Sequence, residues 1–519
     1  MLSYQSMTKL QRMLYDQAKS ANAYYDLLLP GRVGVAGAQA IAEGLKVNTT
    51  LTSLELMEHD IGNDGAKAFA EALKVNTTLT TLSLPQNQIG DAGAQAIAEA
   101  LKVNNTLTFL SLPQNQIGQG GAQAIAEALK VNKTLTLLIL RENQIGSAGA
   151  QAIAEALKVN TTLKELRLDK NQIGDAGTKA IAEALKMNKT LTKLNLIGNQ
   201  IGVAGAEAIA EALKRNMTVQ TLSLERNQIG DVGARVIAKA LEANMAVTTL
   251  SLCENQLGDA GAQVLAEVLK VNATLAVLYL HENQLGDAGA KAFAEALRVN
   301  MTVQRLDLTG NCIGNLGAQA IDEARQVNDE CRVNIDRQIN PLTLSLRPRL
   351  ATAEDIQAVF HLLTGGPELE AQPASLPALP FEIAEPIMDE AHYWQGVQDT
   401  KQVHFADIFP KHPLKVTVPR SIDENPIQVK AIRVIREWKK PSHNAGDSVV
   451  ELTVQDEQGA VRYKCVANPT LVDSTLEFVT IWRADHHIIR EMREGWKVQL
   501  VPSEFSDEFL FESLYVGYV

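Results

Sequence analysis

Apolar residues recur over the first two-thirds of the chain with a period of 28 residues. Leu54 and Leu56 alternate as in a short strand, whereas Ala66, Phe69 and Leu73 are spaced as on one face of a helix. The sequence therefore predicts ten units of strand, turn, helix and return turn. The pattern L-x-x-L-x-L-x-x-N-x-I/L-G opens with Leu or Val at 51, 79, 107, 135, 163, 191, 219, 247, 275 and 303.

A single unit is too small to fold alone. Ordering its backbone costs about 1–2 kcal/mol per residue, whereas each large apolar side chain that is buried contributes about 1.5–3 kcal/mol. Leu54, Leu56 and Ile61 can be buried only against a neighbouring unit. We therefore expect the units to stack, with a ladder of parallel strands inside and a layer of helices outside.

An asparagine follows the strand in nine of the ten units, and His59 replaces it in the first. A short amide at this place can bond the bent backbone of the adjoining unit, so we expect a structural ladder rather than a binding site. The nine residues are Asn87, Asn115, Asn143, Asn171, Asn199, Asn227, Asn255, Asn283 and Asn311.

Two further repeated motifs have a plain structural interpretation. N-x-T occurs in most units, as at Asn76, Asn104 and Asn132, but glycans at 28-residue intervals would crowd one edge of the array, so this Asn is expected to end a helix. Gly90 and Gly93 of "IGDAG" are expected to allow tight entry into a helix. They do not form a phosphate loop, because G-x-x-x-x-G-K-[ST] is absent from the sequence.

The repeat, written LxxLxLxxNxIGxxGAxAIAEALKVN, resembles the ribonuclease-inhibitor type of leucine-rich repeat, and is most similar to the repeats of NOD-like receptors. The resemblance covers residues 31–336 and implies an α/β leucine-rich-repeat solenoid of horseshoe shape. NOD-like receptors also carry an ATPase module, but no Walker motif is present, so the receptor role is not implied. Similar arrays occur in bacterial effectors, which implies a protein that acts on a host protein after delivery into the host cell.

The strand positions that face away from the core differ between units, although "GAQAIAEALKVN" is identical at 93–104, 121–132 and 149–160. Such a surface is where solenoids usually bind, and the leading hypothesis is therefore a protein-interaction scaffold with a protein partner. The alternative for each side chain is a solvated ion pair of about 0–1 kcal/mol. The candidates form a central patch of Phe109, Leu137, Ile139, Arg141, Glu142, Glu165, Arg167, Asp169 and Lys170, and a distal patch of Glu225, Arg226, Tyr279, His281 and Glu282.

Composition limits the classes of partner. The chain has 48 basic and 60 acidic residues, a net charge of -12, which lacks the basic footprint of a nucleic-acid-binding protein. No apolar run approaches the roughly 18 residues of a membrane span. The four cysteines are scattered without C-x-x-C, which fits a reducing, cytoplasmic compartment. We predict no nucleic acid, no membrane insertion, no metal and no cofactor.

The ends of the array differ from its middle. Residues 1–50 are predicted to form a helical cap and a half repeat without a clear strand, and 51–336 the ten repeats with their C-terminal cap. Residues 337–390 are predicted to form a capped helix from Thr352 and a Pro-rich linker from Gly366. Residues 391–519 are predicted to form a smaller β-rich α+β domain, with a hairpin of "SVVELTV" and "AVRYKCV" around Gly459.

Catalytic residues are not assigned. Cys253 and His281 occupy equivalent positions in successive units, but a strand ladder offers no evident oxyanion donors or enclosing pocket. In the C-terminal domain, Cys465 with Asp485, His486 and His487 could supply a thiol, an acid and imidazoles, although Cys465 falls in a strand-like alternation. The alternative function is therefore an effector enzyme in which the repeats select the target and the C-terminal domain modifies it.

Overall fold

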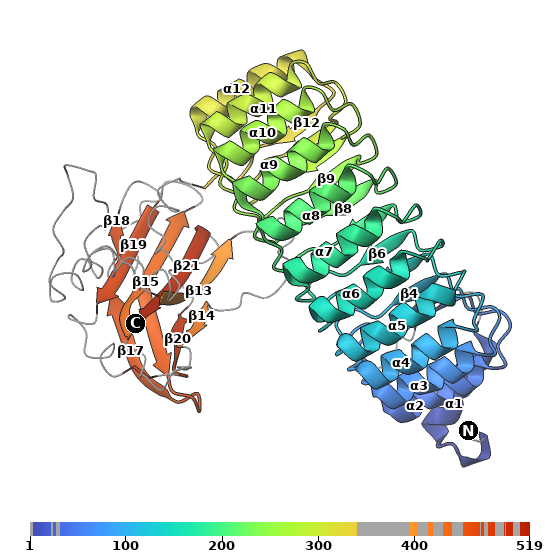
Figure 1. The fold of residues 1–519 in the computed structure, drawn as a ribbon. Helices are drawn as coiled ribbons and strands as arrows, with labels where there is room; N and C mark the ends of the chain where they lie inside the picture. The colour runs from blue at the N-terminus through green and yellow to red at the C-terminus, as the bar shows by residue number, and fades with distance from the viewer. Residues whose placement is uncertain are drawn as a thin grey trace, which may run out of the picture. The chain divides into compact units, whose positions relative to one another are not determined.

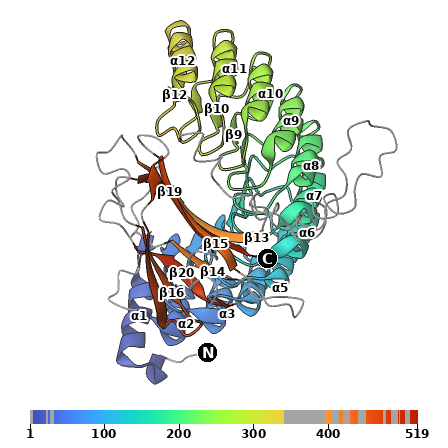
Figure 2. The ribbon, with the colours of Figure 1, turned by 90° about the vertical axis from the view of Figure 1, so that its left-hand side faces the viewer.

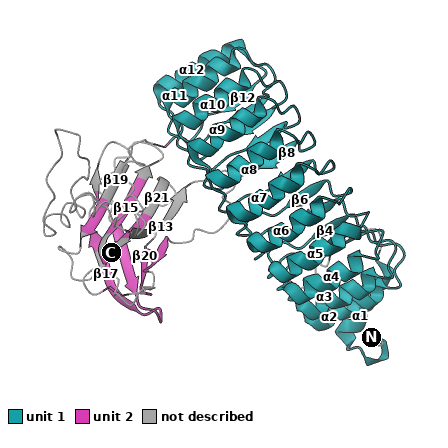
Figure 3. Ribbon diagram, in the orientation of Figure 1, with its two compact units in different colours: residues 1–338 teal, residues 339–519 magenta. Residues whose placement is uncertain are grey.

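The computed structural model divides into two compact units, residues 1–338 and 339–519, which are described separately (Figures 1 and 3). The structure describes residues 4–21, 24–26, 32–339, 395–402, 414–418, 429–438, 450–467, 469–471, 476–482, 492–493, 495–501 and 509–518. The predicted helix from Thr352, the Pro-rich segment from Gly366, and Asp485, His486 and His487 lie outside these residues.

The first unit alternates short strands with helices, and its twelve strands form one parallel sheet in chain order. The strands are β1 (Tyr24–Asp26), β2 (Ser53–Glu55), β3 (Thr81–Ser83), β4 (Phe109–Ser111), β5 (Leu137–Ile139), β6 (Glu165–Arg167), β7 (Lys193–Asn195), β8 (Thr221–Ser223), β9 (Thr249–Ser251), β10 (Val277–Tyr279), β11 (Arg305–Asp307) and β12 (Arg332–Asn334). A short 3₁₀ turn, Tyr4–Ser6, precedes the helices α1 (Lys9–Ser20), α2 (Gly34–Leu45), α3 (Gly62–Leu73), α4 (Asp91–Leu101), α5 (Gln119–Val131), α6 (Gly146–Leu157), α7 (Gly174–Leu185), α8 (Val203–Leu213), α9 (Gly230–Leu241), α10 (Asp259–Leu269), α11 (Asp287–Leu297) and α12 (Asn315–Val327).

The predicted solenoid is confirmed. The strand leucines and the apolar face of each helix form one continuous buried core. Leu54 of β2 and Phe69 of α3 are examples, and the equivalent residues of the other repeats are buried in the same way. The sheet lines the inner, concave side of the curved array and the helices cover its outer side (Figure 2). Each repeat therefore buries its apolar face against the next, as its size requires.

The start of the array differs from the prediction of a half repeat without a strand. Strand β1 pairs with β2 in parallel, with Tyr24 opposite Ser53 and Asp26 opposite Glu55. The segment was missed because it lacks the leucine alternation, which backbone pairing does not require. Helix α1 covers the open end of the core through Leu14 and Ala18, and so completes the cap.

The asparagine ladder is confirmed. The side-chain amide of Asn87 donates from Nδ2 to the carbonyl of Leu56, at 2.6 Å, and its Oδ1 accepts from the backbone N–H of His59, at 3.0 Å. Every member of the ladder is buried and donates in this way to the repeat before it. Backbone groups that no regular strand or helix pairs are thereby satisfied inside the core.

A second asparagine ladder lies at the helix ends. Asn104 donates from Nδ2 to the carbonyl of Leu73, at 2.8 Å, while its Oδ1 accepts from the backbone of Thr106 and Leu107. The same bond recurs at each N-x-T motif from Asn76 to Asn300. Since Nδ2 is the atom that would carry a glycan, these buried, bonded amides support the structural interpretation of the motif.

The turn into each helix takes one of two conformations, and a side chain of the preceding repeat decides which. Asp91 accepts from the backbone N–H groups of Gly118 and Gly121 through one carboxylate oxygen, and Gly118 is extended, with φ −96°. Among the described residues, Gln119 makes no such bond to the next turn. There Gly146 is left-handed, with φ +63°, and donates to the carbonyl of Asn171 instead.

The rule holds throughout the array. The glycine is extended wherever the preceding repeat supplies Asp or Asn, and left-handed wherever it supplies Val, Gln or Ser. The extended glycines are Gly90, Gly118, Gly202, Gly258, Gly286 and Gly314, bonded to Asn63, Asp91, Asp175, Asp231, Asp259 and Asp287. The left-handed glycines are Gly62, Gly146, Gly174 and Gly230, which follow Val35, Gln119, Ser147 and Val203. Gly34, which begins α2 ahead of the first full repeat, is left-handed as well.

The second unit contains two antiparallel sheets, as predicted for a β-rich domain. The orders are β13-β21-β15-β19-β18 and β14-β20-β16-β17. Val434 and Val516 of the first sheet share one buried core with Val416, Leu452 and Val498 of the second. The strands are β13 (Gln395–Gln402), β14 (Lys415–Thr417), β15 (Val429–Trp438), β16 (Val450–Gln455), β17 (Val461–Ala467), β18 (Thr470–Leu471), β19 (Leu476–Trp482), β20 (Lys497–Leu500) and β21 (Phe509–Tyr518).

The predicted hairpin is confirmed, because β16 and β17 pair around a turn in which Gly459 has φ +84°. Cys465 lies in β17 opposite Leu452. Strands β13 and β21 were not predicted, yet β21 pairs with both β13 and β15. The other strands show an alternation of apolar and polar residues. This alternation is missing from the polar sequence of β13 and is interrupted by a serine and a glycine in β21.

Replacement of Asn104 by alanine is expected to destabilise the array by about 2–4 kcal/mol, because the carbonyl of Leu73 and two N–H groups lose buried partners. Urea unfolding measures the loss. Asn105→Ala is the matched control, since Asn105 is exposed, and its effect should stay within about 0.5 kcal/mol. Equal losses for the two variants would contradict the ladder.

Replacement of Asp91 by alanine is expected to switch Gly118 from the extended to the left-handed conformation, at a cost of about 1–2 kcal/mol for two lost charge-assisted bonds. A crystal structure of the variant gives φ of Gly118, and urea unfolding gives the cost. Gln119→Ala, one repeat on, should leave Gly146 left-handed and the stability nearly unchanged. An unaltered φ at Gly118 in Asp91→Ala would show that Asp91 does not determine the conformation of this turn.

Candidate functional surface

The concave face of the array is formed by alternate residues of each strand. Leu54 is fully buried whereas its neighbours Ser53 and Glu55 are half-buried and face outward, as strand geometry requires. Because the strands are in register, equivalent outward residues form columns across the sheet. A partner on this face would meet side chains from several repeats at once.

A left-handed residue follows each of the strands β2 to β12 by three positions and ends the outward series. Glu142, Lys170, Arg226 and Glu282 have φ between +51° and +57°, a conformation that is uncommon outside glycine. The bend turns the chain away from the sheet and leaves these charged side chains at its rim. Glycine stands at the same place in two repeats, such as Gly198 with φ +64°, and this was the sequence signal for the bend.

The apolar area of the central patch spans two strands. Phe109 of β4 lies directly opposite Leu137 of β5, and Ile139 follows on the same strand. All three side chains are half-buried and face outward. They give the concave face an apolar area beside its charged residues.

Glu142 is the centre of a charged cluster. Its carboxylate accepts from Arg141 at 2.7 Å, from Lys170 at 2.9 Å and from Gln114 at 2.6 Å. Burial by itself would raise the pKa of Glu142, but the hydrogen bonds from Arg141, Lys170 and Gln114 prevail and lower it to about 2. The carboxylate therefore stays ionised and fixes two cations of different repeats.

Glu165 has the same role in the next repeat. It accepts from Nε of Arg167 at 2.6 Å and lies 3.6 Å from Nζ of Lys193. Lys193 sits on β7 directly opposite Glu165 on β6. The central patch thus contains cations that are held by shared carboxylates.

Asp169 is the exception in this patch. It is only 6% exposed, and its Oδ2 makes no hydrogen bond to any described residue. Burial raises the pKa of Asp169, and the nearby Glu225 adds to that effect. The positive charges of Arg141 and Arg167 lower the pKa, but not enough to offset burial.

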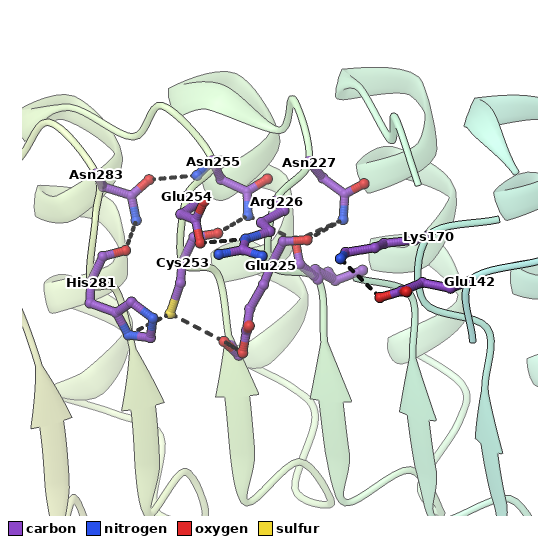
Figure 4. Close-up of polar contacts among 12 residues, drawn as sticks. Glu142, Lys170, Glu225, Arg226, Asn227, Cys253, Glu254, Asn255, His281 and Asn283 are labelled. Carbon is purple, nitrogen blue, oxygen red and sulfur yellow. Dashed lines mark hydrogen bonds and ion pairs between the residues drawn. The ribbon is translucent and has the colours of Figure 1, made fainter. Parts of the chain in front are cut away.

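The distal patch contains a chain of hydrogen bonds across three repeats (Figure 4). Ser251 donates to the carboxylate of Glu225 at 2.7 Å and lies 3.3 Å from the sulfur of Cys253. That sulfur lies 3.0 Å from Nδ1 of His281. The equivalent positions of Cys253 and His281 in successive repeats thus bring their side chains into contact.

This cluster has the character of a structural network. Cys253 is fully buried, and burial raises the pKa of its thiol well above the usual value. A protonated, covered thiol is a poor nucleophile. Among the described residues, no three histidine, cysteine or acidic side chains are grouped so that they could hold a metal ion.

The other distal residues form pairs. Arg226 donates from Nε to Glu254 of the next repeat at 2.6 Å. The ring of Tyr279 meets that of His281 edge-on, with centroids 6.4 Å apart, and its hydroxyl accepts from Arg305 at 3.4 Å. Glu282 follows His281 at the left-handed bend.

Sequence reasoning missed several partners of the predicted residues. Gln114, Lys193, Ser251, Glu254 and Arg305 all bond members of the two patches. Each lies in a repeat next to its partner and in one of the variable columns. That placement was the available signal, because strand register brings such residues together.

Comparison with known proteins agrees with this architecture. A family model described as the NLRC3 LRR domain matches residues 23–355, which is more than half of the chain. The chain belongs to this leucine-rich repeat family. Its LRR array is thus of a kind that typically serves as a scaffold for binding proteins.

A search of curated proteins finds no match. Among solved structures, the LRR chain is similar to "Leiomodin-1 Actin-Binding Site 2 (ABS2)", with 24% identity and a TM-score of 0.26, over 33% of this chain and 90% of that one. In the region of the chain that the structure describes, no helix has the length and apolar character needed to cross a membrane.

Replacement of Asp169 by asparagine is expected to stabilise the protein at pH 7, because it removes a buried charge without an adequate partner. The pKa of Asp169 is raised in the folded state, so the buried carboxylate destabilises the fold fully at pH values above that pKa. This destabilisation disappears as the pH falls below the unfolded-state pKa of about 3.9. Urea unfolding at pH 7 and near pH 4 should show a gain that shrinks on acidification.

Asp64→Asn is the control for this measurement, since Asp64 is exposed beside Lys67 and should change stability by less than about 1 kcal/mol. Loss of stability in Asp169→Asn at pH 7 would show that the two arginines already compensate the charge.

Proposed function

We propose that this protein is an interaction scaffold that binds a protein partner on its concave face, through the central and distal patches. One observation carries the proposal: the outer helices are nearly identical between repeats, whereas the outward residues of the sheet differ. A framework that is copied while one face varies can change its partner without loss of stability.

The chemistry of the face supports a protein as the partner. Half-buried apolar side chains, Phe109, Leu137 and Ile139, adjoin arginines, and tyrosine and histidine stand in the distal patch. Aromatic residues and arginine are enriched among the residues that dominate protein–protein binding energies. The charges are fixed by neighbours such as Glu142, so that less conformational freedom is lost on binding.

The finer proposal concerns the setting. We propose an effector role, in which the protein enters a host cell and binds a host protein in its cytoplasm. The resemblance of the repeats to those of bacterial effectors supports this role, and so does an array joined to a separate β-rich unit without a Walker motif.

Charge reversal of the central patch tests the binding surface. The variant Arg141→Glu/Arg167→Glu/Lys170→Glu should reduce capture of partner proteins from host-cell lysate by at least about tenfold, because it places like charges beside Glu142 and Glu165 and removes exposed anchors. Quantitative pull-down with the full chain measures capture, and circular dichroism verifies that the fold is kept.

A matched variant carries the same change of charge on the outer helices. Lys179, Arg235 and Lys291 are exposed at equivalent positions of α7, α9 and α11. Their replacement by glutamate should leave capture unchanged. Equal capture by wild type and the concave variant, or loss only in the outer variant, would refute binding on the concave face.

A further inference from the structure

Charge is distributed unevenly along the concave face. In the three repeats of β5, β6 and β7, the outward columns carry four cations against three carboxylates, Glu142, Glu165 and Asp169. The first repeat presents Glu55 and Glu58 without a cation in these columns. The cationic block consists of Arg141, Arg167, Lys170 and Lys193.

The far end of the array is acidic too. In the last three repeats, the outward columns carry Glu254, Glu282 and Asp307 against Arg305. A positive centre is thus flanked by negative ends, in a chain whose net charge is -12. Such a pattern attracts a short negative segment and repels one that continues towards either end.

The cations of the block retain hydrogen-bonding capacity. Among the described residues, Arg141 donates through Nε and Nη2, both to one oxygen of Glu142, although a guanidinium has five N–H donors. Lys170 donates to the same oxygen, and an ammonium has three donors. The side chains are held in place, yet they can still bind carboxylates from another molecule.

The size of the block fixes the length of what it can bind. Neighbouring strands lie about 4.8 Å apart, so the path from β4 to β7 is about 14 Å. An extended chain covers that distance in about four residues. The apolar residues Phe109, Leu137 and Ile139 lie at the β4–β5 end of this path.

We infer that the central patch and the cationic block bind an acidic peptide segment of the protein partner, about four residues long and adjoined by an aliphatic or aromatic side chain. This inference rests on the proposed function and names the chemistry of the partner. Carboxylates of the segment pair with Arg141, Arg167 and Lys193, and the apolar side chain packs on Leu137 and Ile139.

A peptide fits this surface better than a nucleic acid. Glu142, Glu165 and Asp169 stand between the cations, where the evenly spaced phosphates of a strand would meet them. The acidic ends also oppose a long polyanion. A peptide can place its few carboxylates at the cations and pass the acids with neutral residues.

Direct binding to the full chain tests the inference. The probe is a fluorescein-labelled peptide in which three glutamates and one serine stand between leucines, and its counterpart has lysines in place of the glutamates. Fluorescence anisotropy should show that the acidic peptide binds at least about tenfold more tightly and that added salt weakens its binding. A single-stranded oligothymidine of similar length is the third probe.

Two variants locate the site. Arg167→Glu/Lys193→Glu should weaken binding of the acidic peptide at least about tenfold. Arg167→Gln/Lys193→Gln, which adds no like charge beside Glu165, should weaken it about threefold, and thus guards against misfolding of the first. Lys179→Glu/Lys291→Glu on the outer helices should have no effect.

Preference for the basic peptide, equal binding of the oligonucleotide, or insensitivity to the Arg167 and Lys193 variants would each overturn the inference. None of these results alters the proposed function, which fails only if capture of whole partner proteins ignores the concave variants. The two statements can therefore be separated experimentally.

Discussion

A buried side-chain amide joins each repeat to the one before it, and the array depends on this bond. Asn87 and Asn104 show its two forms, in which Nδ2 donates to a carbonyl of the preceding repeat and Oδ1 accepts from backbone N–H groups. The connections between strand and helix carry backbone groups that neither element pairs. Without the amides, stacking would bury these groups without partners, at a cost of about 1–3 kcal/mol for each group.

Much of the fold could be predicted from the sequence, because the leucine and alanine positions obey the two periods of strand and helix. The two turn conformations could not, since the state of Gly118 depends on Asp91 in the preceding repeat. A local sequence pattern includes only the residues of the turn itself, and the residue that decides the conformation of the turn lies in another repeat. Strand β1 escaped prediction for a related reason, because it is defined by pairing with β2 rather than by leucines.

The concave face was predicted as a set of positions, and the structure adds their pairing. Alternation alone places Arg141 and Glu165 outward. It cannot show that Glu142 binds Lys170 and Gln114 from two other repeats, because this depends on side-chain rotamers and on the left-handed bend. Likewise, the sequence position of Asp169 does not reveal that its side chain is buried and that its Oδ2 has no hydrogen-bond partner among the described residues.

The dependence of the helix-entry turn on the neighbouring repeat affects how such arrays evolve. Duplication of a 28-residue segment copies its amino-acid sequence. It does not copy the backbone conformation of the turn into its helix, because the preceding repeat determines that conformation. Gly118 and Gly146 illustrate this, since they sit in almost the same local sequence and adopt opposite signs of φ. A repeat moved to a new place in the array would therefore adopt the helix-entry turn that its new preceding repeat dictates. The geometry of each turn is encoded in the sequence of the repeat before it.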